Sequence, residues 1–307
     1  MEVITVGHAS VDRVIIKGRE KLQLGGAAIY SAMAAKIFSE TGVVSRVGED
    51  FPMKFFTTLR NCKIDTRGIK RVKGKSTFFE IEYDEDEVAH YKQYKLNVGV
   101  FLKPKDIPKC YLKAKAFHLA PMAASKQRKF IDFIRKNTDA ILSLNTHVGF
   151  LPKYRKELLN IIPLVDIFTL NEEEAMKLTN TKRLEYAVKI LKRIKHKLII
   201  VTLGVIGSVV IDRDVTFFPS VYQPKTVDLT GCGDAFAGAF VSSYIKTKDA
   251  LKAANIANSV AGIVASAWNF RGIKNLRFSS LDKFHEYIFS RQRKLRKMQF
   301  SIDSFIR

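Results

Sequence analysis

The chain has few cysteines and no long uninterrupted hydrophobic run. Its 307 residues include three cysteines, Cys62, Cys110 and Cys232, which stand far apart. This spacing excludes a disulfide framework and the paired ligands of a zinc site, so we expect a reducing compartment. The most membrane-like window, 250–268, is interrupted by one lysine and two asparagines. It is typical of a buried helix of a water-soluble protein and excludes a membrane span.

The N-terminal segment lacks the pattern of a secretory signal, because an acidic residue stands at position 2 and few apolar residues follow it. The chain also lacks internal repeats, low-complexity segments and long linkers. Its length suits one large domain, and we predict a single domain over 1–307. Together these features predict a cytoplasmic protein.

Acidic residues are scarce relative to basic ones. The chain has 30 Asp and Glu against 52 Lys and Arg, a formal net charge of +22. Such an excess attracts anions, so nucleic acids, nucleotides and phosphorylated metabolites are candidate partners. The excess is spread along the chain, and one dense basic run, 291–297, is better explained by a solvated terminal helix than by a nucleic-acid patch.

Short apolar segments alternate with helical patterns along most of the chain. This order predicts an α/β fold with a doubly wound, mostly parallel sheet flanked by helices, which binds ligands at the carboxyl ends of its strands. Strands are expected at 3–6, 43–47, 116–119, 140–144, 167–170 and 198–202, with an antiparallel pair at 208–212 and 215–218. Helices are expected at 27–38, 51–62, 125–136, 153–162, 172–178, 183–194, 231–246, 248–267 and 281–296.

A different pattern interrupts this alternation between residues 73 and 98. The β-rich segments 77–83 and 88–94 are joined by the acidic turn 84–87, which predicts an inserted antiparallel hairpin. We expect the hairpin to join the segment 14–24 in a small sheet over a cleft, a lid built from about 12–25 and 73–99. A structural flap and a functional lid both fit this pattern.

The stretch 228–236, Asp-Leu-Thr-Gly-Cys-Gly-Asp-Ala-Phe, combines groups suited to phosphate chemistry. Its glycine-rich turn leads directly into a helix, so backbone N–H groups would point outward together toward a phosphate oxygen. Asp234 would stand at the mouth of this concavity, where a carboxylate can accept a proton from an attacking hydroxyl. Taken alone, a helix N-terminus capped by Thr230 or Asp234 is the simpler explanation.

Four more places at predicted strand ends carry suitable groups, each with a structural alternative. Asp12 can accept hydrogen bonds from two hydroxyls of a polyol, or occupy a turn. Gly25-Gly26 permits close approach of a ligand, or forms a plain turn. Asn171 and Glu174 have capping-box spacing, or Glu174 orients water on a Mg2+ ion. The segment 202–207 forms a tight turn, or a floor for nucleotide phosphates.

Together these elements resemble the ribokinase-like carbohydrate kinases, often called the PfkB family. The stretch 228–236 with Gly238 and Phe240 is similar to the family's C-terminal signature, and Gly25-Gly26 before an Ala-rich helix is similar to its N-terminal one. Asn171-x-x-Glu174 and Thr202-x-Gly204-x-x-Gly207 resemble its inner motifs. Order and spacing agree from about residue 1 to residue 285.

The resemblance implies ATP-dependent transfer of the γ-phosphoryl group to a hydroxyl of a sugar or polyol, inositol-like acceptors included. Asp234 would be the base, and the backbone N–H groups of Gly231, Cys232 and Gly233 would form the anion hole. The remaining implied roles are acceptor binding by Asp12, Gly25, Gly26 and Tyr30, nucleotide binding by Thr202, Gly204, Gly207 and Asn258, water-mediated Mg2+ binding by Asn171 and Glu174, and K+ as a candidate monovalent cation beside Asp228 and Thr230. The lid would exclude water and so limit wasteful ATP hydrolysis.

Three departures from the family pattern bear on the acceptor and the site. Tyr30 stands where many members have Asn, which argues against ribose-type and fructose-type acceptors and points to the inositol-kinase-like branch. Cys232 replaces the usual Ala, and the segment 142–145 keeps Asn145 without the common nearby Asp.

Two alternative functions stay open at this stage. One is a nucleoside or phosphosugar kinase on the same fold, and the other is a non-catalytic protein that binds nucleic acid through its basic surface. Asp234 argues against the second, because a protein that only binds needs no base. We therefore expect ATP and a sugar, polyol or nucleoside as partners, with neither membrane nor nucleic acid, and a homodimer through the lid as a further candidate.

Overall fold

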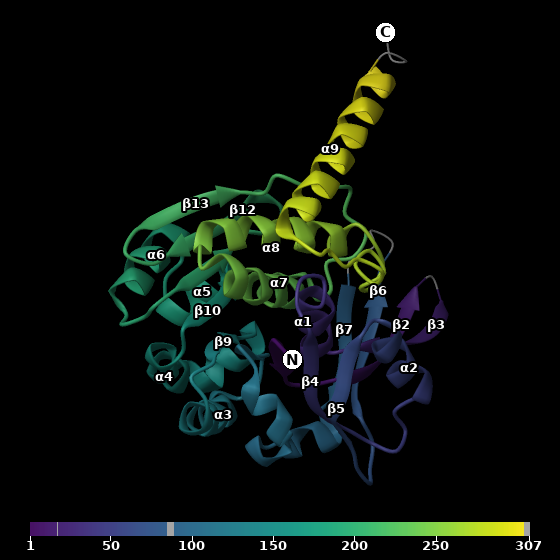
Figure 1. Cartoon of the computed structure of the whole chain (residues 1–307), viewed down its shortest axis with the longest axis vertical. Helices are drawn as coiled ribbons and strands as arrows, with labels where there is room; N and C mark the ends of the chain where they lie inside the picture. The colour runs from purple at the N-terminus through teal and green to yellow at the C-terminus, as the bar shows by residue number, and fades with distance from the viewer. Residues whose placement is uncertain (17, 85–88, 304–307) are drawn as a thin grey trace.

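A nine-stranded sheet forms the centre of the molecule in the computed structural model, which describes residues 1–16, 18–84 and 89–303 (Figure 1). Its strands are β1 (Val3–Val6), β4 (Thr41–Val47), β5 (Ile64–Arg71), β8 (Ala116–Leu119), β9 (Ile141–Asn145), β10 (Ile167–Asn171), β11 (Ile199–Thr202), β12 (Gly207–Ile211) and β13 (Val215–Pro219). The order is β13-β12-β11-β10-β9-β8-β1-β4-β5. All neighbours from β5 to β11 are parallel, and β12 and β13 extend the sheet antiparallel. This confirms the predicted doubly wound, mostly parallel sheet.

Helices cover both faces of this sheet. They are α1 (Ala27–Ala35), α2 (Met53–Asn61), α3 (Ala124–Asn137), α4 (Leu151–Ile161), α5 (Glu172–Thr179), α6 (Leu184–Arg193), α7 (Cys232–Thr247), α8 (Ala250–Ala265) and α9 (Leu281–Asp303). Side chains alternate along β1, so Val3 packs in the core with α1, α7 and α8, whereas Ile4 and Val6 pack in the core with α3 to α6. The far end of α9 extends away from the body (Figure 1).

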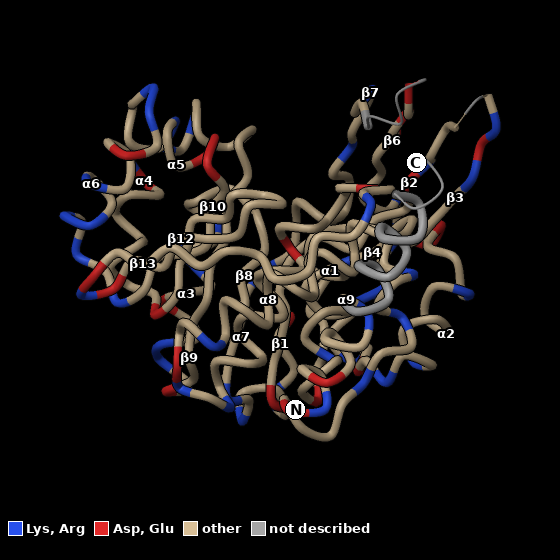
Figure 2. The backbone as a smooth tube through the Cα atoms, turned by 90° about the horizontal axis from the view of Figure 1, so that it is seen from above, with Lys and Arg blue, Asp and Glu red and all other residues tan. Residues whose placement is uncertain are grey.

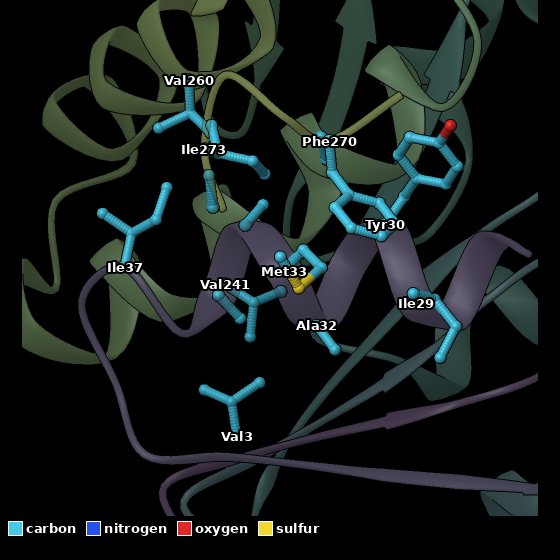
Figure 3. Packing of buried hydrophobic residues seen from close by; sticks show 14 of the residues in the cluster. Val3, Ile29, Tyr30, Ala32, Met33, Ile37, Val241, Val260, Phe270 and Ile273 are labelled. Carbon is cyan, nitrogen blue, oxygen red and sulfur yellow. The ribbon is translucent and has the colours of Figure 1, made fainter. Parts of the chain in front are cut away.

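Helix α1 packs very closely on α7. A Cβ added at Gly238 of α7 would lie 2.0 Å from the carbonyl oxygen of Ser31, so only glycine permits this approach. Small side chains such as Ala32 face the contact, and Met33 and Val241 fill the space beside it (Figure 3). The Ala-rich composition of α1 therefore positions the helix that starts at the glycine-rich turn.

A second, smaller sheet lies beside the large one (Figures 1 and 2). Its strands are β2 (Ser10–Ile16), β3 (Arg19–Gly25), β6 (Thr77–Tyr83) and β7 (Ala89–Lys95), in the order β3-β2-β6-β7. The pairs β2–β3 and β6–β7 are antiparallel, and β2–β6 is parallel. The predicted hairpin and its predicted partner are both present, whereas residues 85–88 of the predicted acidic turn lie outside the described residues. We call these four strands the small sheet.

Other parts of the fold differ from expectation. Strand β5 and the 3-10 turns between residues 97 and 113 were not predicted, and α1 ends three residues before the predicted Phe38. Lysine and arginine are distributed around the periphery of the molecule (Figure 2). Across the described ranges, no helix has both the length and the apolar character needed to cross a bilayer.

Candidate active site

Two adjoining hollows lie at the carboxyl ends of the central strands. The first, which we call the aspartate hollow, has a volume of about 380 Å3 and is lined by Tyr91, Pro121, Asn145, Thr146, His147, Thr169, Leu170, Asn171, Glu174, Thr202, Leu229, Thr230, Gly231, Gly233 and Asp234. The second, the glycine hollow, has a volume of about 100 Å3 and shares Thr202, Leu229 and Gly233 with the first. The two hollows therefore form one cleft, at the edge of the sheet where doubly wound folds bind ligands.

Asp234 lies in the first turn of α7 and is held from two sides. The side-chain amide of Asn145, at the end of β9, donates a hydrogen bond to Asp234 Oδ1 at 2.8 Å. The hydroxyl of Ser31 on α1 donates to the Asp234 backbone carbonyl at 3.0 Å. Burial raises the pKa of the Asp234 carboxyl to about 6, and the hydrogen bond from Asn145 opposes this rise. The result is a fixed carboxylate that is mostly ionised at neutral pH and can accept a proton.

The turn before α7 provides backbone N–H groups next to this carboxylate. Gly231 caps the helix with φ of +75°, a conformation that favours glycine. The amide of Gly233 lies in the first helical turn, where no intrahelical acceptor exists, and a Cβ at Gly233 would meet no atom within 4 Å. The N–H of Cys232 donates to the Leu229 carbonyl at 3.2 Å, so this predicted donor already has an acceptor. The open side of the predicted anion hole is therefore at Gly233.

The thiol of Cys232 is poorly suited to redox chemistry. Burial raises its pKa to about 12, and the carboxylates of Asp228 and Asp234 contribute to the rise. The group stays a thiol at neutral pH, which disfavours oxidation because the thiolate is the reactive form.

Asn171 and Glu174 form a reciprocal capping box at the start of α5. The Asn171 N–H donates to Glu174 Oε2 at 2.9 Å, and the Glu174 N–H donates to Asn171 Oδ1 at 2.8 Å. Glu174 is 5% exposed and still lines the aspartate hollow. Burial raises its pKa to about 7, and the nearby Asp234 carboxylate adds to the rise. The Glu174 side chain therefore caps α5 and also lines the cleft.

The acidic residues of the cleft can hold Mg2+ only if the phosphates of a bound nucleotide supply further ligands. No group of three or more His, Cys, Asp or Glu residues in the described ranges could hold a metal ion. Mg2+ in phosphoryl-transfer sites is usually held by one or two carboxylates, several waters and the substrate phosphates. Glu174 and Asp234 border the same hollow, so they can supply the protein's share of such a site.

The glycine hollow contains all four residues predicted to bind the nucleotide: Thr202, Gly204, Gly207 and Asn258. Gly204 has φ of +58° and open space where a side chain would stand, so a ligand can approach its backbone. The amide of Asn258 is 5% exposed and donates to Ser208 Oγ at 3.2 Å. Residues from α8 and from the segment after β13 complete a narrow, partly apolar groove.

The small sheet brings Asp12 and Tyr91 to the other side of the cleft. Asp12 is the third residue of β2, is 3% exposed, and accepts a hydrogen bond from Ser10 Oγ at 2.6 Å. Burial raises its pKa to about 7. Tyr91 lines the aspartate hollow with a ring that is 58% exposed. Its pKa is raised to about 12, first by burial and then by the carboxylates of Asp12, Asp234 and Asp228.

Gly25 and Gly26 make room for these groups. A Cβ at Gly25 would lie 1.7 Å from Asp12 Oδ2, so any larger residue would displace the carboxylate. Gly26 caps α1 with φ of +100°, and a Cβ there would lie 2.3 Å from the His8 carbonyl oxygen. Both glycines are therefore required by the local packing.

Tyr30 lies beneath the turn and outside the lining of both hollows. It is 2% exposed, its ring contacts Phe270 edge-on at 5.8 Å between centroids (Figure 3), and a Cβ at Gly231 would lie 2.3 Å from its ring. Its hydroxyl has no hydrogen-bond partner among the described residues. The predicted contact of Tyr30 with the acceptor stays a prediction, and the role the structure gives it is support of Gly231.

Asp228 receives hydrogen bonds from three donors. Its Oδ1 accepts from the Thr230 N–H and from the Tyr83 hydroxyl, both at 2.8 Å, and its Oδ2 accepts from the Asn269 N–H at 2.9 Å. The Tyr83 hydroxyl is also 3.1 Å from Thr230 Oγ1. These three hydrogen bonds hold the carboxylate in place, and K+ beside Asp228 and Thr230 stays a prediction.

Four residues of the site were not assigned roles from the sequence: Tyr83, Tyr91, Asn145 and Asn269. Asn145 carried a signal, because it follows a predicted buried strand whose carboxyl end faces the cleft. Asn269 has φ of +56°, a conformation that asparagine tolerates better than most residues. The two tyrosines lie in a predicted β-rich hairpin, and no local pattern indicates their long-range contacts.

Comparison with known proteins agrees with this geometry. Residues 2–270 match the family described as pfkB family carbohydrate kinase. The chain is 31% identical over 257 residues to the cytidine kinase of Thermococcus kodakarensis, which covers 80% of this chain and 88% of that protein. It is 23% identical over 281 residues to a nucleoside kinase of Methanothermobacter thermautotrophicus, covering 86% and 89%.

Similarity extends to solved structures. The nucleoside kinase of Methanocaldococcus jannaschii superposes with a TM-score of 0.77 at 22% identity, covering 96% of this chain and 99% of that one. At this identity the superposition shows a shared fold. Since the family match spans nearly the whole chain, the chain belongs to the pfkB family of carbohydrate kinases, phosphotransferases that act on an alcohol group.

Proposed function

We propose that this kinase transfers the γ-phosphoryl group of ATP to a hydroxyl of a nucleoside, with Asp234 as the base. The observation that carries the proposal is the position of Asp234 in the aspartate hollow, in the first turn of α7 and next to Gly233, which lines both hollows. A nucleotide in the glycine hollow would direct its phosphates toward Gly233. An acceptor in the aspartate hollow would then approach the terminal phosphate from the side of Asp234.

Asp234 is suited to proton acceptance because its pKa, about 6, is near the operating pH. Asn145 fixes the orientation of the carboxylate, so its free oxygen is directed to the acceptor hydroxyl. The amide of Gly233 and the N-terminal end of α7 stabilise negative charge on the transferred group. Mg2+ held with the phosphates near Glu174 would neutralise part of the charge on the nucleotide.

The nature of the walls supports a nucleoside as acceptor. Tyr91 offers an exposed aromatic face on which a base can stack, and the buried carboxylate of Asp12 can accept hydrogen bonds from ribose hydroxyls. The relatives named for cytidine and nucleoside phosphorylation support the same substrate class. Inositol-like acceptors, which we predicted from Tyr30, lose support because Tyr30 is buried beneath the turn.

An acceptor screen tests this proposal. The purified full-length protein is incubated with ATP and MgCl2 and with one of four acceptor groups: nucleosides, free sugars, polyols including inositol, and sugar phosphates. Product formation is measured by ADP release and by mass spectrometry of the phosphorylated acceptor. We expect kcat/KM to be highest for a nucleoside.

The Asp234→Asn variant is the matched control, because it keeps the side-chain shape and the hydrogen bond from Asn145. It should lose phosphoryl transfer and keep its affinity for ATP. Preferential turnover of a sugar, polyol or sugar phosphate would refute the nucleoside assignment, and near-normal turnover by the variant would refute the assignment of the base.

A further inference from the structure

Tyr83 connects the small sheet directly to the turn that precedes α7. It is the last residue of β6, and its side chain is 5% exposed. Its hydroxyl donates to Asp228 Oδ1 at 2.8 Å and lies 3.1 Å from Thr230 Oγ1. One hydroxyl of the small sheet therefore contacts two side chains of the 228–236 stretch.

The ring of Tyr83 is positioned as firmly as its hydroxyl. It packs edge-on against Trp268 at 4.9 Å between centroids, and Val14 and Ile81 form a small apolar cluster around it. Trp268 immediately precedes Asn269, whose N–H donates to Asp228 Oδ2. Tyr83 therefore contacts Asp228 directly through its hydroxyl, and its ring packs on the residue that precedes the Asn269 donor.

Asn269 adds a second connection between the same parts. Its side-chain amide donates to the Leu24 carbonyl on β3 at 2.9 Å, while its backbone N–H bonds Asp228. Asp228 thus joins the small sheet, the segment after α8 and the turn before α7. The Thr230 N–H donates to the same carboxylate, so the position of the turn depends on how Asp228 is held.

We propose that Tyr83 is a positioning residue: its hydroxyl, carried by the small sheet, completes the hydrogen bonding of Asp228 and holds the 228–233 turn in the conformation needed for phosphoryl transfer. This inference rests on the proposed function. Because this hydroxyl belongs to the small sheet, movement of the sheet away from the turn would break its hydrogen bond to Asp228, which couples transfer to the position of the small sheet.

The Tyr83→Phe variant tests this proposal, because it keeps the ring on Trp268 and removes the hydroxyl. The matched control is Tyr94→Phe on β7, a ring that stacks on Phe79 and is 66% exposed. For both variants and the wild type, kcat and KM are measured for ATP and for the acceptor found in the screen. ATP hydrolysis without acceptor is measured in parallel.

A second measurement does not depend on activity. Hydrogen–deuterium exchange, followed by mass spectrometry on the ligand-free proteins, compares peptides that cover 77–84 and 228–233. We expect faster exchange in both peptides of Tyr83→Phe and unchanged exchange in Tyr94→Phe. Fluorescence of Trp268, the single tryptophan of the chain, confirms that the variant keeps its fold.

The expected kinetic result is a kcat lower by about tenfold in Tyr83→Phe, the effect of losing one hydrogen bond to a charged group. The KM for ATP should stay within about twofold, because the glycine hollow lies outside the contact, and uncoupled hydrolysis should rise relative to transfer.

Wild-type kcat in Tyr83→Phe, or unchanged exchange in both peptides, would each overturn the proposal. A wild type that phosphorylates no acceptor would instead refute the proposed function, and the exchange measurement would then decide on Tyr83 alone.

Discussion

Replacing Asp234 with Asn should make the protein more stable while it removes transfer. The ionised carboxylate is unfavourable in the folded protein, because burial raises its pKa from 3.8 to about 6. A displacement of about two pKa units corresponds to up to about 3 kcal/mol. The asparagine keeps the acceptor oxygen for Asn145 and removes the buried charge, so the free energy of unfolding should rise by about 2–3 kcal/mol at pH values above 6.

The sign of this effect depends on pH in a defined way. Because the folded-state pKa of Asp234 is raised, the wild type loses stability as pH rises from about 4 to about 6 and stays at the lower level above that. The advantage of the variant is therefore complete above pH 6 and disappears below the unfolded-state pKa of 3.8, where the carboxyl is protonated in both folded and unfolded chains. Thermal unfolding at several pH values should show a midpoint higher by about 4–6 °C in the alkaline range.

Asp228→Asn is the matched comparison, six residues earlier in the same stretch. Its carboxylate accepts hydrogen bonds from three donors, and an amide group would direct its own hydrogens at one of them. This variant should therefore lose about 1–3 kcal/mol of stability. An Asp234→Asn protein that is no more stable than the wild type above pH 6, or that keeps more than about 1% of the transfer rate, would refute the reasoning.

Three further predictions follow from the packing and the charges. The kcat/KM for the acceptor should fall as pH decreases through 7 and 6, because Asp12 and Asp234 must both be ionised. The fall should be steeper than the uptake of a single proton produces, and a pH profile with a single protonation step would contradict this. Gly25→Ala should raise the KM for the acceptor at least about tenfold by displacing Asp12. Gly233→Ala should instead leave the unfolding midpoint unchanged and weaken ATP binding. Steady-state kinetics and thermal unfolding measure these effects, and the opposite assignment of effects to the two variants would contradict the reasoning. The buried ammonium of Lys36 donates hydrogen bonds to the carbonyls of Ile273, Lys274 and Leu276. Lys36→Met should therefore lower the free energy of unfolding by about 3 kcal/mol or more in urea titrations. An unchanged midpoint would show that these bonds contribute little.

Most of the fold could be predicted from the sequence because strand and helix patterns alternate clearly. Strands such as β1 and β8 are short, wholly buried and mostly apolar, so each has a strong local signal. Strand β5 was missed because it lies at the edge of the sheet, and five of its eight residues are polar or charged. Its position depends on pairing with β4, which no local pattern expresses.

The candidate site could be predicted where function and local structure use the same residues. The glycine-rich turn, Asp234, and the pair Asn171 and Glu174 each have a recognisable local pattern, and the structure brings them to one cleft. The contact of Tyr83 with Asp228 spans 145 positions along the chain, so no local pattern could reveal it. Tyr30 shows the opposite case, because its helical position was correct but its burial beneath Gly231 follows from tertiary packing.

The close contact between α1 and α7 has a consequence for how this enzyme can diversify. Both helices start at the cleft, and at Gly238 their backbones leave no room for a side chain. The two helices, and Asp234 with them, therefore behave as one rigid unit. Asp12 and Tyr91, which we propose contact the acceptor from the opposite side, belong to strands outside these two helices. Substitutions in those strands can therefore alter which alcohol is chosen while the geometry of proton transfer is conserved.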